Sequence, residues 1–143
     1  MSAPLRACLC ACVLALGAGC GAPSRDLFIV ERTGALPGAR LTLVVDDGGF
    51  VRCNGGERLQ VSSEQLIDAR ELTRALDGEE IDPGPARRGL SLPARPGSQL
   101  RFIVRTEHGR VAFADTSAGQ PPELPRIAQL TRELAKEVCG LRR

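Results

Sequence analysis

Cys20 is the residue whose type and surroundings point most clearly to a specific chemistry. It follows the small residues Ala18 and Gly19, and a positively charged N-terminus and an apolar run of about a dozen residues precede it. This layout is typical of a cleaved export signal, because a membrane-spanning helix needs about 20 apolar residues. A thiol at the cleavage point can take a diacylglycerol through a thioether and become the new N-terminus. We therefore expect residues 1–19 to be a lipoprotein signal peptide and Cys20 to carry lipid.

Ordinary secretion is the alternative. The residue three places before Cys20 is Gly17, whereas the strongest lipoprotein pattern has leucine there, and Leu16 lies one place further out. Cleavage near Ala22 would then leave a secreted protein with no anchor. If Cys20 is lipidated, residues 20–26 form a tether, and acyl chains hold the exported protein on the outer face of the bacterial cell membrane.

Cys53 and Cys139 form a second candidate pair. Removing residues 1–19 discards three of the six cysteines, and lipid would occupy Cys20. Two remaining thiols in an oxidising compartment most simply form one disulfide. A zinc site is the rival, but with His108 the chain offers at most three soft ligands, and structural zinc sites need four. We predict a Cys53–Cys139 disulfide and no metal.

A search for catalytic groups gives no site. His108 lies beside Gly109 in what looks like a hairpin tip, which favours a turn residue over a general base. No serine sits in a Gly-x-Ser-x-Gly turn, so a serine triad is not indicated. Asp46 and Asp47 lack the spaced carboxylates of a calcium loop. We therefore expect a protein that is not an enzyme and has no cofactor.

Charge and composition exclude a nucleic-acid partner. The formal net charge of the whole chain is +2, and it falls to +1 when Arg6 leaves with the signal peptide. The sequence has four phenylalanines and no tryptophan or tyrosine. A chain whose charges nearly balance does not have the strongly basic surface of nucleic-acid binders. With so few aromatic residues, it also offers no platform on which bases could stack.

Regular structure in the first half of the chain follows from alternation and turn residues. We predict strands over residues 27–33, 41–45 and 50–54, and Asp46-Asp47-Gly48-Gly49 joins the last two as a tight hairpin. Ser62 and Gln65 have the spacing of a capping box, and apolar residues at helical spacing follow. A helix is therefore predicted over residues 63–76.

The second half repeats a hairpin and a helix after an interruption. Residues 77–99 are rich in glycine and proline, and we expect a long exposed loop there. Alternating residues over 100–106 and 110–115 predict a second hairpin. A stripe from Leu124 to Val138 then predicts a helix that begins in a proline-rich turn and ends at Gly140.

These elements define one α+β domain over residues 27–143. We expect a small antiparallel sheet of about five strands, formed by two hairpins and packed on two helices, with one disulfide.

Two stretches of the chain resemble the emfourin family. They are residues 28–38, with the sequence FIVERTGALPG, and the hairpin from LRFIV at 100–104 through VAFAD at 111–115 to the helix start at 122–124. Emfourins are small protein inhibitors of thermolysin-like metallopeptidases, so the resemblance implies an α+β fold of this order and a peptidase partner. The chain also resembles uncharacterised exported lipoproteins of actinobacteria, which implies no activity.

The resemblance to emfourins points to one loop as the partner-binding element. Thermolysin-like enzymes accept a bulky apolar side chain next to the scissile bond, and Leu36 lies in a loop restricted by glycine and proline. A restricted loop loses little entropy on binding. The implied contacts are Gly34, Ala35, Leu36 and Pro37. The alternative is that Leu36 packs on the domain's own core and the glycines only form the turn.

Two functions follow as expectations. The first is a non-enzymatic cell-envelope lipoprotein anchored by Cys20, with the membrane as its partner through lipid. The second is an emfourin-like inhibitor with a metallopeptidase as partner.

Overall fold

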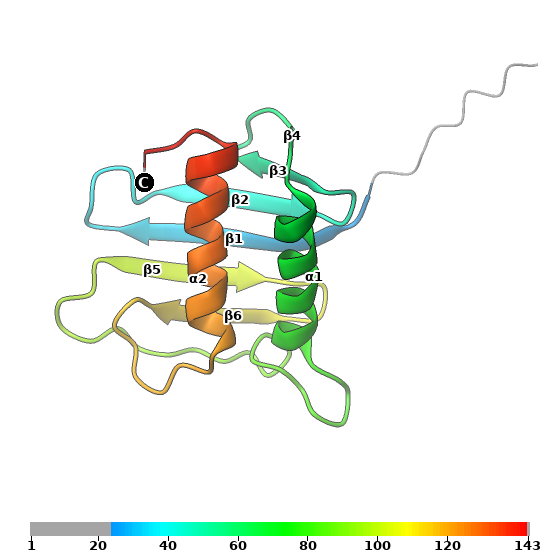
Figure 1. The fold of residues 1–143 in the computed structure, drawn as a ribbon. Coiled ribbons are helices and arrows are strands. Elements are labelled where there is room, and N and C mark those ends of the chain that lie inside the picture. The colour runs from blue at the N-terminus through cyan, green and yellow to red at the C-terminus, as the bar shows by residue number, and fades with distance from the viewer. Residues whose placement is uncertain (1–23, 143) are drawn as a thin grey trace, which may run out of the picture.

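The computed structural model describes residues 24–142. Within that range six strands form one antiparallel sheet in the order β4-β3-β2-β1-β5-β6, and both helices cross the same face of it (Figure 1). The predicted α+β class is confirmed. The bounds are β1 Asp26–Gly34, β2 Leu41–Asp46, β3 Phe50–Cys53, β4 Leu59–Gln60, α1 Ser63–Asp77, β5 Leu100–Arg105, β6 Arg110–Ala114, α2 Glu123–Glu133 and the π-helical turn η1 Leu134–Val138.

Strand β1 joins the two halves of the sheet. It pairs with β2 on one side, where Val30 lies opposite Leu43, and with β5 on the other, where Val30 lies opposite Val104. Phe28 and Val30 are buried beneath the helices, whereas Glu31 points to the other face. This alternation follows from the two-residue period of a strand. The long central strand therefore positions the chain segments that lie at its two ends.

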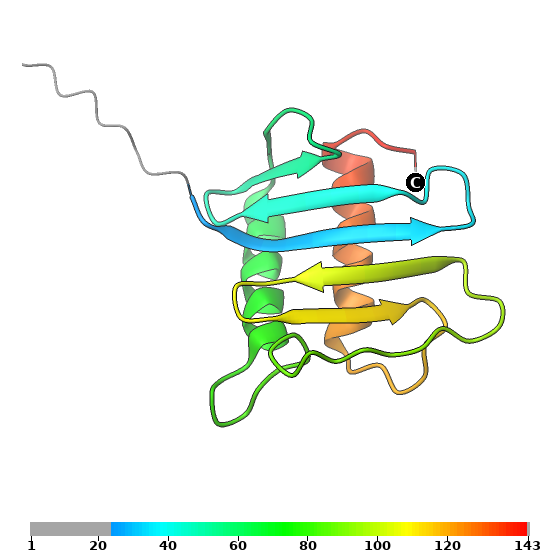
Figure 2. The same ribbon diagram turned by 180° about the vertical axis from the view of Figure 1, so that it is seen from behind.

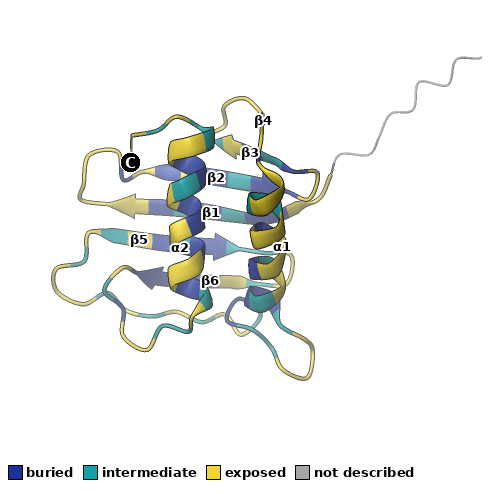
Figure 3. Ribbon diagram, viewed as in Figure 1, coloured by how far each residue is buried: buried dark blue, intermediate teal, exposed yellow. Residues whose placement is uncertain are grey.

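The core fills the single layer between the sheet and the helices. Helix α1 buries Ala69, Leu72 and Leu76, and α2 buries Leu124 and Ile127 (Figure 3). Each buried leucine or isoleucine contributes about 1.5 to 3 kcal/mol through the hydrophobic effect. The opposite face of the sheet has no helix over it among residues 24–142 (Figure 2).

Both helix starts agree with the sequence analysis. The hydroxyl of Ser62 accepts a hydrogen bond from the Gln65 amide at 3.1 Å, and the Gln65 side chain accepts one from the Ser62 amide at 2.9 Å, so the capping box is confirmed. Helix α2 begins directly after Pro122 and has Pro125 in its first turn, as predicted. After η1 the chain passes Cys139 and turns at Gly140, whose φ of 65° is left-handed, as expected for the residue after a helix.

The predicted exposure of residues 77–99 is wrong for their middle part. Ala86 has no exposed surface, and its carbonyl oxygen accepts a hydrogen bond from the Arg110 amide at 2.9 Å. The amide of Leu92 donates to Ala112, and the amide of Ala112 donates to Leu90. The segment 85–92 therefore lies along β6 and covers that edge of the sheet. Covering an edge in this way removes a template for aggregation.

The opposite edge carries the strand that the sequence analysis missed. Strand β4 has only two residues, in which Leu59 lies opposite Val51 and Gln60 opposite Phe50. A strand this short leaves little edge on which another chain could pair.

Candidate functional site

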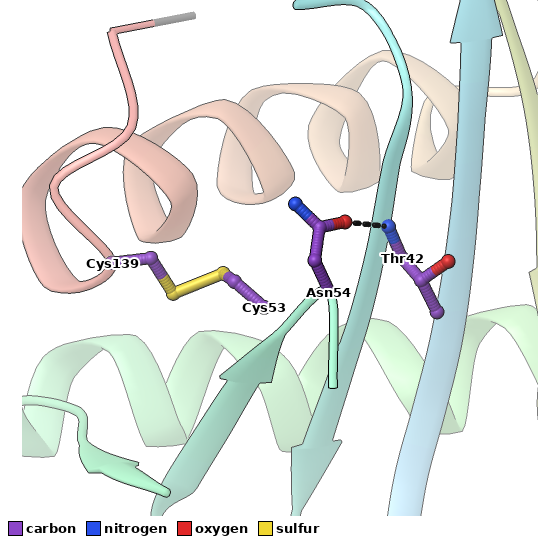
Figure 4. The surroundings of a disulfide bond; sticks show 4 residues. All are labelled: Thr42, Cys53, Asn54 and Cys139. Atoms are coloured by element: carbon purple, nitrogen blue, oxygen red, sulfur yellow. Dashed lines mark hydrogen bonds between the residues drawn. A yellow bond between two sulfur atoms is a disulfide. The ribbon is translucent and has the colours of Figure 1, made fainter. Parts of the chain in front are cut away.

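The disulfide fixes the C-terminal end of the domain to the sheet. Cys53 at the end of β3 is bonded to Cys139 after η1, with an S–S distance of 2.09 Å (Figure 4). The next residue, Asn54, takes a positive φ of 53°, and its side-chain oxygen accepts a hydrogen bond from the Thr42 amide at 2.9 Å. The predicted pairing of Cys53 with Cys139 is confirmed.

The loop that was predicted to contact a partner leaves the end of β1. Gly34 lies so close to the neighbouring chain that a Cβ atom there would be 2.0 Å from the carbonyl oxygen of Gln99. That carbonyl also accepts a hydrogen bond from the Ala35 amide at 3.2 Å. Glycine is therefore required at residue 34 by close backbone approach, and it sets the direction in which residues 35–39 leave the sheet.

Arg32 holds the other end of the same loop. Its Nε donates to the carbonyl oxygen of Ala39 at 2.9 Å, and one of its Nη atoms donates to that of Gly38 at 3.2 Å. The Arg32 side chain is buried, and burial lowers its pKa from the usual value. The Ala39 amide closes the loop by donating to the Leu36 carbonyl oxygen at 3.0 Å. The loop is thus clamped at both ends.

Leu36 lies on the outside of this clamped loop. It is 38% exposed, so it does not belong to the core. The structure brings Gly34, Ala35, Leu36 and Pro37 together at one loop, with Gly34 at its base, and all four are exposed.

A groove of about 360 Å³ lies beside the loop, and we call it the distal groove. Its aliphatic walls are Leu36, Pro37, Ala39 and Leu100. Its remaining lining consists of basic residues from β1, α2, η1 and the C-terminus, namely Arg32, Arg132, Lys136 and Arg142. No acidic residue lines it within the described part of the chain. The groove therefore combines an apolar surface with several basic side chains.

A second hollow of about 320 Å³ continues from the distal groove between α2 and the sheet. The two share Arg32, Leu100 and Arg132 as lining residues. The second hollow also touches Phe102 and Phe113, whose rings stack with centroids 5.0 Å apart. Both rings are buried, so they give this part of the surface a firm apolar base.

Asp115 fixes the segment that contacts the loop. Its carboxylate accepts hydrogen bonds from the Ser98 hydroxyl at 2.7 Å and from the amides of Gln99 and Leu100. Burial acts to raise its pKa, but these hydrogen bonds prevail and hold the pKa below its ordinary value. The ionised carboxylate thus fixes Gln99, whose carbonyl oxygen accepts the hydrogen bond from the Ala35 amide.

The other candidate residues named from the sequence, His108 and Asp46, lie in or beside turns. His108 lies in the turn between β5 and β6, half exposed, with its Nε2 3.9 Å from a Glu107 carboxylate oxygen. The carboxylate of Asp46 accepts hydrogen bonds from the Gly48 and Phe50 amides of its own turn. No group of three or more potential metal ligands occurs among residues 24–142.

A larger hollow, of about 610 Å³, lies at the other end of β1. Its lining mixes arginines with acids, and pairs such as Arg25 with Glu107 and Arg70 with Asp47 cross it. The charges there are largely balanced, whereas no acidic residue of the described chain lines the distal groove.

The predicted lipidation residue, Cys20, lies outside the described residues. Neither described helix is long and apolar enough to cross a membrane. Comparisons with protein-family models, with curated proteins and with solved structures find no match for this chain.

The basic side of the distal groove is a feature that the sequence analysis missed. Arg132 and Lys136 are four residues apart and share one helix face, which is the only signal the sequence offers. Such a pair is ordinary on an exposed helix, and only the fold places it opposite Leu36.

Proposed function

We propose that this protein is an exported, lipid-anchored, non-enzymatic binding protein that presents its partner-binding end away from the membrane. The observation that carries the proposal is the position of the two ends of β1. The described chain enters the sheet at the start of β1, and the clamped loop leaves at its end (Figure 1). Nine extended residues span about 30 Å, so an anchor at Cys20 would lie on the far side of the domain from the loop.

The chemistry of the distal groove supports binding rather than catalysis. Aliphatic walls and arginine or lysine side chains can hold an apolar group and an anion, but arginine cannot act as a general base near neutral pH. His108, the one histidine of the chain, is in the β5–β6 turn at the other end of the sheet.

Replacement of Cys20 by alanine tests the anchoring. We expect the Cys20→Ala variant to move almost completely from the membrane fraction to the soluble fraction, because acyl chains supply the membrane affinity at about 0.8 kcal/mol per buried CH₂. The measurement is immunoblotting of fractionated cells. A Ser24→Ala variant, changed in the same N-terminal segment, should stay with the membrane. A Cys20→Ala protein that remains on membranes would show that lipid is not the anchor.

A second candidate function is inhibition of a thermolysin-like metallopeptidase. The observation that favours it is Leu36, which is exposed on a loop clamped at both ends, because such a loop meets a cleft with little loss of conformational entropy. The resemblance to emfourins in residues 28–38 gives the same loop this role.

Titration of a thermolysin-like peptidase with the processed full chain tests this second function. We expect inhibition to weaken by about 100-fold in Leu36→Asp, because a leucine buried at an interface contributes about 2 to 3 kcal/mol. Ile67→Asp is the matched control, since Ile67 is 54% exposed on α1, away from the loop. The inhibitor function is wrong if the unchanged protein fails to inhibit at micromolar concentration.

A further inference from the structure

We propose that the distal groove binds a partner protein through a segment in which an apolar side chain is flanked by carboxylates. The inference names the chemistry of the partner and rests on the proposed function only in taking the loop end of the domain as the binding end. It does not depend on the partner's being a peptidase, and the lipid anchor enters only where a protein is chosen over the membrane as the occupant.

The apolar half of the groove fits one side chain of such a segment. Leu36, Pro37, Ala39 and Leu100 line this half. The volume of about 360 Å³ lies within the usual range of ligand pockets, which is about 300 to 1,000 Å³. The walls are held in place before a ligand arrives, because Arg32 and the Gln99 carbonyl oxygen clamp the loop.

The basic half of the groove favours a partner that carries carboxylates. Arg132 and Lys136 are exposed, and within residues 24–142 neither they nor Arg142 has an acidic partner. Five other surface arginines pair with acids in the same range, namely Arg25, Arg58, Arg70, Arg105 and Arg126, whereas exposed arginines such as Arg88 and Arg95 do not. Arg132 and Lys136 therefore differ from other exposed cations by their place around an apolar hollow, not by the lack of an ion pair. Cations near a helix C-terminus are favoured by the helix dipole, but the dipole does not require them to surround an apolar hollow. Charge complementarity therefore favours a segment with several acidic groups.

The position of the groove favours a protein over the membrane that carries the anchor. The groove lies beside the loop that follows β1, and the described chain enters the sheet at the opposite end of this strand (Figure 1). A domain anchored through Cys20 would therefore turn the groove outward. A concave groove also fits a projecting side chain of a protein better than it fits a flat lipid surface.

Fluorescence anisotropy with the processed full chain tests the inference. The probe is a labelled peptide in which one leucine is flanked on each side by two glutamates. We expect saturable binding, and we expect the Arg132→Glu/Lys136→Glu double variant to bind at least about tenfold more weakly. The matched control is Arg88→Glu/Arg95→Glu, which makes the same change in net charge outside the groove and should bind as the unchanged protein does.

Two further peptides separate the apolar contribution from the charge. A peptide with serine in place of the leucine should bind about tenfold more weakly, and one with lysines in place of the glutamates should not bind. Equal losses in the groove variant and in the control variant would overturn the proposal, because the binding would then be a general charge effect. So would the absence of peptide binding at about 1 mM.

Two other occupants of the groove appear as distinct outcomes. Binding to phosphatidylglycerol vesicles that is lost in Arg132→Glu/Lys136→Glu would assign the groove to lipid. Self-association that is lost in the same variant, measured by sedimentation, would assign it to a second copy of the chain. Either result overturns the proposal. Membrane release by Cys20→Ala and peptidase inhibition are measured separately, so a failure of the groove does not count as a failure of the proposed function.

Discussion

Replacing both Cys53 and Cys139 by serine will lower the free energy of unfolding by about 4 kcal/mol. The bond closes a loop with a sequence separation of 86 residues, and the chain-entropy model gives about 4 to 5 kcal/mol for a loop of this length. This is a large share of the 5 to 15 kcal/mol that typically stabilises a domain, as an order of magnitude. Urea unfolding of the variant and the oxidised parent measures the difference.

Reduction supplies the control for this result. A reducing agent should bring the parent to nearly the stability of the double serine variant and leave the variant itself unchanged. The expectation fails if the variant loses less than about 1 kcal/mol, since the reduced chain would then have to retain the ordering that the bond imposes.

The disulfide also shows why parts of this fold can be predicted from the sequence. If residues 1–19 are removed and Cys20 carries lipid, only two cysteines remain, and elimination then pairs Cys53 with Cys139. In the same way, the capping box at Ser62 and Gln65 is local chemistry that needs no knowledge of the rest of the chain. Two-residue alternation likewise located the strands of both hairpins to within one or two residues.

Features that depend on distant backbone pairing were missed. Strand β4 has two residues, too few for any alternation, and it exists because Leu59 and Gln60 pair with β3. Pro85 and Ala86 lie in a segment rich in proline and glycine, which predicts a loop but says nothing about where the loop docks. The segment docks where the Ala86 carbonyl oxygen accepts a hydrogen bond from the amide of Arg110, more than twenty residues later in the sequence.

The candidate site also has one part that the sequence predicts and one part that depends on the fold. The clamped loop at residues 34–39 could be predicted from its glycine and proline residues, although the role of Arg32 as its clamp could not. The distal groove needs Leu36 and Lys136 at one place, and they are separated by most of the domain. Only the sheet order, which puts β1 at the centre with α2 above it, brings the two together.

Gly109→Ala will release the segment 85–92 from the edge of β6. A Cβ atom at residue 109 would lie 2.1 Å from the carbonyl oxygen of Ala86, which also accepts the hydrogen bond from the Arg110 amide. The backbone must separate to admit the methyl group, and we expect a loss of about 2 to 4 kcal/mol as hydrogen bonds break and Ala86 becomes exposed. Limited trypsin digestion measures the release directly, because Arg87 and Arg88 lie within the segment.

Gly56→Ala is the matched control for this change. Its Cβ atom would lie 3.1 Å from the Cys53 carbonyl oxygen, so a shift of a few tenths of an ångström admits it. The control should resist trypsin as the parent does, whereas Gly109→Ala should be cut first after Arg87 or Arg88. If Gly109→Ala is as resistant as the control, the segment is not held by close contact at Gly109. Early cleavage would instead establish that backbone contact with β6, rather than any local sequence preference, gives this proline-rich segment its structure.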